Sequence, residues 1–303
     1  MNSFITARDR IRKFILSKEI LFLKLWNMLI ALAGTLLIST QFGYQKIPGQ
    51  IWVAILISLV CALLPLSGVS FVLVAYLVIN LYALNTQVAL FFIGFVILGY
   101  LVCAYFHSKN TYNLVTIPLC FGLHTPYSMA LGSGLMCKLN EVTSVICGSV
   151  VAYYLHVIKH NASDILDETT DFSITALVSE QMFKNKMFYF YIAAMVAMFL
   201  VVYFLRSADI HTSWLIAIVA GIIVEFAIML SGYLLNSQKG EILSLVIGNI
   251  IAFVVGIILN YFIMDLDYSR IEKVQFEDDD YYYYVTAVPK IRIVDEEKQV
   301  KTF

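Results

Sequence analysis

The chain has 303 residues, of which 60% are hydrophobic and 14% are charged, with a mean hydropathy of +0.82 and a formal net charge of -1. Soluble domains are typically about 45–50% apolar and about 25% charged, so this composition excludes an ordinary soluble domain and predicts a polytopic membrane protein in contact with a lipid bilayer. The near-neutral charge gives no reason to expect a nucleic-acid partner.

The N-terminal segment, residues 1–19, interleaves five basic residues with apolar ones. This pattern predicts a short amphipathic helix on the inner membrane surface, or alternatively a cationic flank that only sets orientation. In both cases the positive-inside rule places the N-terminus in the cytoplasm. No small-residue cleavage site follows the first apolar run, so we expect a retained membrane helix there.

Residues 20–264 are predicted to form an all-α bundle of membrane-spanning helices, each of which needs about 20 apolar residues. Two shorter runs, 50–66 and 69–85, form either a thin hairpin of two spans or two half-helices, and both arrangements return the chain to its starting side. The runs of sufficient length are 20–40, 87–106, 139–157, 187–205, 212–235 and 241–264.

The stretch 112–136 departs from this pattern because it holds two prolines and three glycines. Proline disfavours helix at the residue before it, and glycine weakens what remains, so we predict a broken or re-entrant element. Irregular backbone at membrane depth persists only where protein covers it or where it lines a wet cavity.

The stretch 112–136 also decides the topology. A full crossing gives about nine spans and puts the basic C-terminal tail outside, whereas a re-entrant segment gives about eight spans. In the second arrangement Lys109, Lys138, Arg206 and the tail lie with the basic N-terminus. The positive-inside rule favours eight spans with both termini cytoplasmic. The lack of targeting signals favours the plasma membrane.

A polar loop, 158–186, separates two of the predicted spans and is acidic in its first half. Its second half places Phe172, Leu177, Val178 and Met182 near one side of a short surface helix. The alternative is a solvated linker without a packed face.

Glu225 lies near the middle of the apolar run 212–235. A charge at the bilayer centre costs on the order of 2.5–3.5 kcal/mol on insertion scales, so the side chain should face protein or water. Ala217, Gly221 and Gly232 share its side of the helix and predict close packing there. Glu225 then either binds a proton or cation, or is a neutral glutamate that holds helices together.

The last apolar run carries the most regular pattern in the chain, a small or polar residue at every fourth position. This spacing predicts a packing seam. Asn249, which lies beside the seam, and Ser244, which is its first residue, are candidate polar partners for Glu225. The row consists of Ser244, Gly248, Ala252, Gly256 and Asn260.

Two more polar residues, His124 and Asn80, complete the candidate substrate or ion site with Glu225 and Asn249. His124 lies between the prolines of 112–136, and contact with Glu225 would make a proton relay. Asn80 lies in a short apolar run, where an amide can bond across helices. The alternative for each is a structural hydrogen bond.

The sequence holds no P-loop, nucleophile-elbow, zinc-protease or dinucleotide-binding motif. Cys103 with His107, and Cys120 with His124, have a four-residue spacing that zinc ligands use on a helix. The five cysteines all lie in or beside apolar runs, so small buried side chains are the simpler interpretation. We therefore expect no metal, no cofactor and no enzymatic activity.

The tail, residues 265–303, has high strand propensity. A segment of this length rarely builds a core alone, so it is either disordered or paired with a partner, to whose sheet edge it would add a strand. Its partner-binding candidates are the consecutive tyrosines Tyr281, Tyr282, Tyr283 and Tyr284.

Two functions of different classes fit these features. The first is a transporter or permease-like subunit for a small solute or ion, because transporters place substrate sites at broken helices near mid-membrane. The second is a non-enzymatic scaffold or subunit of a larger complex that docks a partner through its tail. We favour transport.

Overall fold

The computed structural model describes residues 14, 17–44, 51–109, 111–166, 173–208, 212–263, 272–277 and 282–287. The chain divides into two units, a helical unit of residues Lys18–Tyr261 and a second unit that holds both termini. The amphipathic segment predicted at the N-terminus lies almost wholly outside the described residues.

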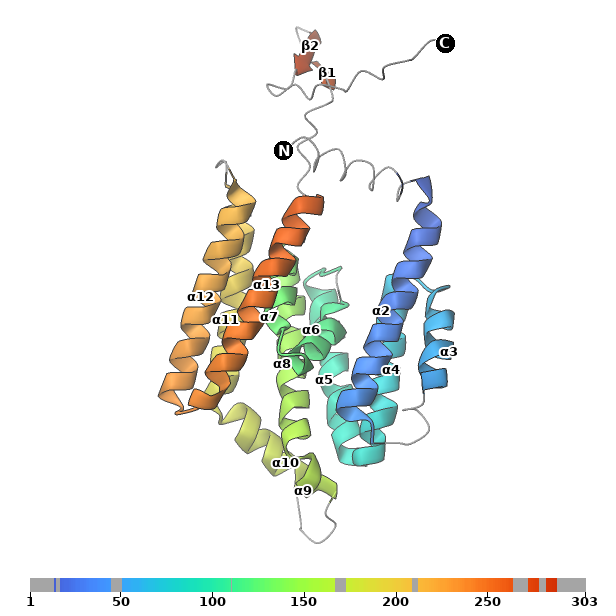
Figure 1. The fold of residues 1–303 in the computed structure, drawn as a ribbon, viewed down its shortest axis with the longest axis vertical. Coiled ribbons are helices and arrows are strands. Elements are labelled where there is room, and N and C mark those ends of the chain that lie inside the picture. The colour runs from blue at the N-terminus through green and yellow to red at the C-terminus, as the bar shows by residue number, and fades with distance from the viewer. Residues whose placement is uncertain are drawn as a thin grey trace, which may run out of the picture. The chain divides into compact units, whose positions relative to one another are not determined.

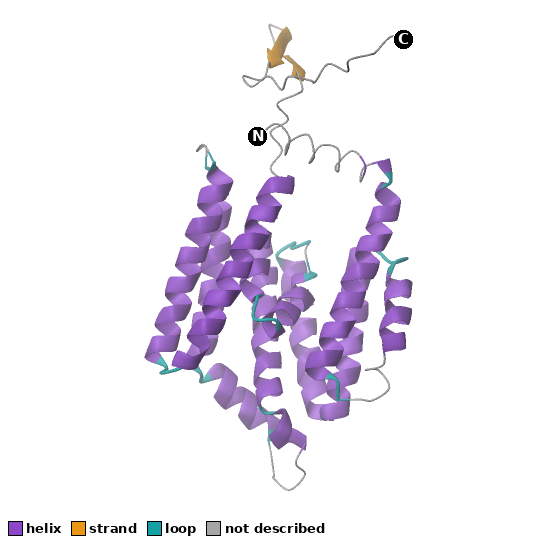
Figure 2. Cartoon of the chain, in the orientation of Figure 1, coloured by secondary structure: helices purple, strands orange, loops and turns teal. Residues whose placement is uncertain are grey.

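Seven of the described helices are long and apolar enough to cross a membrane, which confirms the predicted helical bundle and indicates a membrane protein (Figures 1 and 2). They are α2 (Glu19–Phe42), α4 (Leu66–Leu84), α5 (Thr86–Tyr105), α8 (Val142–His160) with the 3₁₀ turn η1 (Leu139–Glu141) before it, α11 (Lys186–Arg206), α12 (Ser213–Leu235) and α13 (Ile242–Ile263).

The outward-facing side chains of these helices are apolar, as contact with lipid requires. Leu90, Ile223 and Leu243 are 62%, 62% and 70% exposed. A soluble protein rarely exposes so many large apolar side chains together.

Helix α4 runs parallel to α2, so the short helix α3 (Ile51–Cys61) returns the chain between them. The Asn27 amide on α2 donates to the Leu64 carbonyl just before α4 at 2.8 Å, and Ser39 lies 2.7 Å from the Tyr76 hydroxyl further along both helices. Of the two forms expected for 69–85, a span and a half-helix, the structure favours the span, because α4 begins at Leu66 and is long and apolar enough to cross a membrane.

The predicted break in 112–136 is confirmed. The helices α6 (Asn113–Gly122) and α7 (Pro126–Met136) are joined by a turn in which His124 has a positive φ of 58°. Pro126 opens α7, where proline is favourable. Pro118, however, lies inside α6, so the helix tolerates this proline and ends at Gly122, two residues before the left-handed His124.

The helices α6 and α7 form a hairpin whose base, at Asn113 and Met136, lies beside the beginning of α8. The Asn113 amide donates to the hydroxyl oxygens of Ser133 on α7 and Ser144 on α8, at 3.1 and 2.9 Å. Arg206, at the end of α11, donates to the Leu135 carbonyl. The beginning of α6, the end of α7, the beginning of α8 and the end of α11 are thus at one end of the bundle.

The hairpin reaches only part of the way along the bundle. Its two helices have 10 and 11 residues, whereas α8 has 19. At about 1.5 Å per residue the hairpin is about 15 Å deep and α8 about 28 Å long. Gly148 on α8 allows this close approach, because a side chain there would overlap the Asn113 carbonyl oxygen. Helices α6–α8 lie between the α2–α5 group and the α11–α13 group (Figure 1).

The polar loop contains the short helices α9 (Ala162–Leu166) and α10 (Ile174–Leu177), followed by a turn of π-helix, η2 (Val178–Phe183). Leu177, Val178 and Met182 are buried, as the predicted one-sided pattern requires. Phe172 lies outside the described residues.

In the second unit, β1 (Glu272–Glu277) pairs with β2 (Tyr282–Ala287) in an antiparallel register that sets Phe276 opposite Tyr283. The strand propensity predicted for the tail is confirmed in these residues. The two strands of the tail pair with each other. Tyr281 lies outside the described residues.

We predict that Asn113→Ala lowers the free energy of unfolding by about 1–2 kcal/mol, because two buried interhelical hydrogen bonds are lost. The measurement is unfolding of the purified protein in detergent. Asn140→Ala, which removes the same amide from an exposed position, is the matched control. Equal stability of the two variants would contradict a structural role for the hairpin base.

Candidate functional site

A cavity of 940 Å³ lies at the end of the bundle opposite the hairpin base. Its lining comes from the ends of α2, α8 and α12 and from the beginnings of α11 and α13. The hairpin tip, residues 123–125, lies at the inner end of the cavity, where His124 and the adjacent Pro126 line it. The cavity exists because α6 and α7 stop short of this end while the surrounding helices continue.

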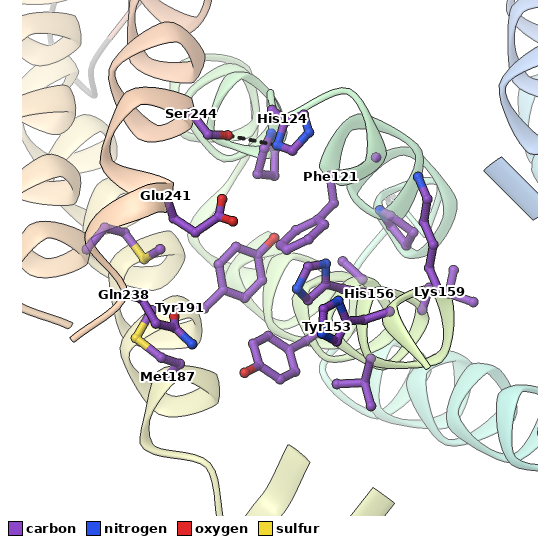
Figure 3. A pocket seen from close by; sticks show the side chains of 18 of the residues that line it. Phe121, His124, Tyr153, His156, Lys159, Met187, Tyr191, Gln238, Glu241 and Ser244 are labelled. Atoms are coloured by element: carbon purple, nitrogen blue, oxygen red, sulfur yellow. Dashed lines mark hydrogen bonds between the residues drawn. The ribbon is translucent and has the colours of Figure 1, made fainter. Parts of the chain in front are cut away.

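Helix α13 packs against the hairpin tip. Its Ser244 hydroxyl lies 2.8 Å from Nδ1 of His124 (Figure 3). One turn further on, a side chain at Gly248 would overlap the His124 carbonyl oxygen, so the glycine allows the two backbones to approach closely. Ala252 and Gly256 are also buried, and Gly256 faces Leu131 of α7. The predicted packing seam is formed by these residues.

Four basic side chains line the cavity, and we call His124, His156, Lys159 and His160 the basic cluster. The last three lie on the final turns of α8. His156 is close enough to interact electrostatically with each of the other three. None of the four has an ion-pair partner among the residues described.

An aromatic wall of Phe121, Tyr153 and Tyr191 adjoins the basic cluster. The rings of Phe121 and His156 have centroids 5.0 Å apart, and those of Phe121 and Tyr191 are 5.1 Å apart in an edge-to-face arrangement. Tyr153 lies 6.1 Å from both His156 and Tyr191. Figure 3 shows these side chains meeting from α6, α8 and α11.

Glu225 is fully buried in the protein interior next to this cavity, and is not part of its lining. Its electrostatic neighbours include Tyr127 on α7, Tyr191 on α11 and Tyr233 on α12, all of which line the cavity. The three tyrosines therefore adjoin both the carboxyl group and the cavity.

Neither carboxyl oxygen of Glu225 has a hydrogen-bond partner within the described part of the chain. Asn249 on α13 is the polar side chain beside the carboxyl group, but the two groups do not meet the geometry of a hydrogen bond. Its amide nitrogen instead donates to the Leu245 carbonyl at 3.0 Å. A buried polar group without a partner costs free energy, and a charged one costs far more.

The structure brings some of the predicted site residues together and separates others. Asn249 lies beside Glu225, as expected. Ser244 bonds to His124 and not to Glu225, and no hydrogen bond between described residues joins His124 to Glu225. Asn80 is buried on α4, where its amide donates to the Tyr76 carbonyl of its own helix at 2.8 Å. It does not line the cavity.

The small residues on α12 pack against α11. Gly221 faces Val202, and Gly232 faces Phe190. Ala217 is buried in the same row. Close packing at these positions is as the sequence predicts, although the neighbour is the preceding helix and not α13.

His156, Lys159 and His160 were not predicted as site residues, since His156 is a single polar residue within the apolar run 139–157 and the other two follow that run. Their spacing of three and four residues places them on one face of α8. Extending the predicted helix 139–157 by one turn would have placed these three residues together at the end of an apolar span.

No three His, Cys, Asp or Glu side chains in the described ranges are grouped to hold a metal ion. No protein-family model, no curated protein and no solved structure matches the chain. The class of the protein therefore rests on its own helices, which are those of a multi-pass membrane protein with a cavity at one end of the bundle.

Proposed function

We propose that the protein is a plasma-membrane transporter for a small solute, and that the cavity is the solute's entry site. The observation that carries this proposal is the 940 Å³ cavity that ends at a broken helical hairpin beside a buried, unpartnered glutamate. Half-helices that meet inside the membrane are where transporters commonly bind substrate.

In this proposal the chain crosses the membrane eight times. The parallel arrangement of α2 and α4 supports a crossing by α3 in addition to those of the seven long helices. The hairpin of α6 and α7 enters and leaves on the side of its base, with Lys109, Lys138 and Arg206. The positive-inside rule makes this side cytoplasmic, so both termini are cytoplasmic and the cavity opens outside.

Glu225 is the proposed proton-binding group. An unpaired buried carboxylate is costly as a charge and much less costly as the neutral acid. A solute in the cavity can change this balance through the tyrosines that adjoin both the cavity and Glu225. Ionisable groups inside membrane helices commonly form proton pathways in transporters.

We predict that Glu225→Gln abolishes proton-coupled uptake while the protein still inserts and folds, because glutamine fills the same space and cannot carry the proton. Proteoliposomes that enclose a pH-sensitive dye would receive a panel of impermeant organic anions and neutral solutes. A co-transported solute acidifies the lumen with wild-type protein and not with Glu225→Gln.

Glu180→Gln is the matched control, since Glu180 is exposed and forms a surface ion pair with Lys184. It should transport at the wild-type rate. Unchanged acidification with Glu225→Gln would remove Glu225 from the mechanism, and no acidification by any solute with wild-type protein would contradict proton-coupled transport.

A scaffold function is the second candidate, and the pairing of β1 with β2 favours it. A two-stranded hairpin alone is marginally stable in water and gains from a third strand. Tyr284 on β2 is 75% exposed and offers a large side chain to a partner. This proposal assigns the tail a protein partner bound by strand addition.

We predict that deleting residues 272–303 removes a co-purifying protein while the helical unit keeps its thermal stability. Affinity purification of the full chain and of the truncated chain from the same membranes measures this. Recovery of the same proteins with both chains would contradict tail-mediated docking.

A further inference from the structure

We propose that the cavity binds a small organic anion, whose carboxylate lies against the basic cluster and whose apolar body lies against the aromatic wall. This inference rests on the proposed function, because it takes the cavity as the solute site and names the class of solute.

Basic side chains outnumber acidic ones in the cavity lining, and this favours an anion. The four residues of the basic cluster line it, whereas Glu241 is the one acidic side chain among its described lining residues. The ion pair that the structure describes, between Lys184 and Glu180, involves neither of these groups. A lysine and three imidazoles near one another without a carboxylate partner leave a site that an anion would complete.

The lining also holds hydrogen-bond donors that are free to bind a ligand. His124 uses Nδ1 toward Ser244, and no described residue bonds to its Nε2. Tyr191 lines the cavity with its ring, whereas its hydroxyl is buried and has no hydrogen-bond partner among the described residues. The donors open to the cavity are therefore the imidazole N–H groups, which donate to carboxylate oxygens, and the three ammonium donors of Lys159.

The aromatic wall indicates the chemistry of the rest of the ligand, beyond its carboxylate. Phe121 and Tyr191 meet edge to face, and His156 lies between Phe121 and Tyr153. This surface stacks well against a planar or apolar group and gives few partners to the hydroxyls of a sugar. Cavities of about 300–1,000 Å³ accept drug-sized molecules, so a carboxylate with a ring attached fits in 940 Å³.

The test is equilibrium dialysis of the purified full chain in neutral detergent with radiolabelled benzoate, corrected by protein-free micelles. Benzamide, which is nearly isosteric and uncharged, is the matched ligand. We expect benzoate to bind at least about tenfold more tightly than benzamide, because a charge-assisted contact contributes about one such factor.

The matched variants are Lys159→Gln and His160→Gln, both at exposed positions, with Lys138→Gln as the control at the opposite end of the bundle. Lys159→Gln should weaken benzoate binding about tenfold, His160→Gln should weaken it less, and Lys138→Gln should leave it unchanged. Benzamide binding should not change in any of them. Equal binding of the two ligands, or equal benzoate binding in Lys159→Gln and Lys138→Gln, would overturn the anion site.

Two further outcomes separate the alternatives. Displacement of benzoate by phosphatidylglycerol, and not by neutral lipid, would identify a lipid-headgroup site and overturn the assignment to a soluble solute. If benzoate binds as expected but the protein shows no uptake activity, the anion site is supported and transport is refuted. If the protein takes up only neutral solutes together with protons, the anion site is refuted and transport is supported.

Discussion

The requirement that backbone polar groups inside the bundle find partners within the protein governs this fold, and it is hardest to satisfy at the turn between α6 and α7. The turn satisfies this requirement with its own residues. The His124 amide donates to the Phe121 carbonyl at 3.0 Å, and the Thr125 amide donates to the Cys120 carbonyl at 2.9 Å. Gly248 lets α13 cover the turn from outside. The cavity beyond the tip is a consequence of ending the hairpin there.

The buried carboxyl group and the basic cluster share tyrosine neighbours. Tyr191 belongs to both environments, because it lines the cavity, packs in the aromatic wall and interacts electrostatically with Glu225. A bound anion and a bound proton would therefore influence each other through this side chain. Such coupling between two sites is reciprocal, so each ligand would strengthen the binding of the other by the same factor.

Local sequence features predicted much of the bundle and part of the site. The prolines and glycines of 112–136 indicated a break, and the four-residue spacing on α12 and α13 identified buried faces. Both features depend only on residues close together in the sequence. The neighbour of each face could not be predicted in this way. The packing of α12 against α11, the tolerance of Pro118 within α6 and the meeting of His124 with α8 all depend on contacts between distant segments.

We propose that α6 and α7 enter and leave on the same side of the membrane, and cysteine labelling tests this topology most directly. Single cysteines at Lys109 and Lys138, on either side of the hairpin, would be introduced into a variant without native cysteines and tested with an impermeant thiol reagent on intact cells. A third cysteine at Gln238, at the cavity, reports the other side. We expect Gln238→Cys to be labelled and both hairpin positions to be protected until the cells are opened. Labelling of only one hairpin position in intact cells would show that 112–136 crosses the membrane and would contradict the re-entrant hairpin.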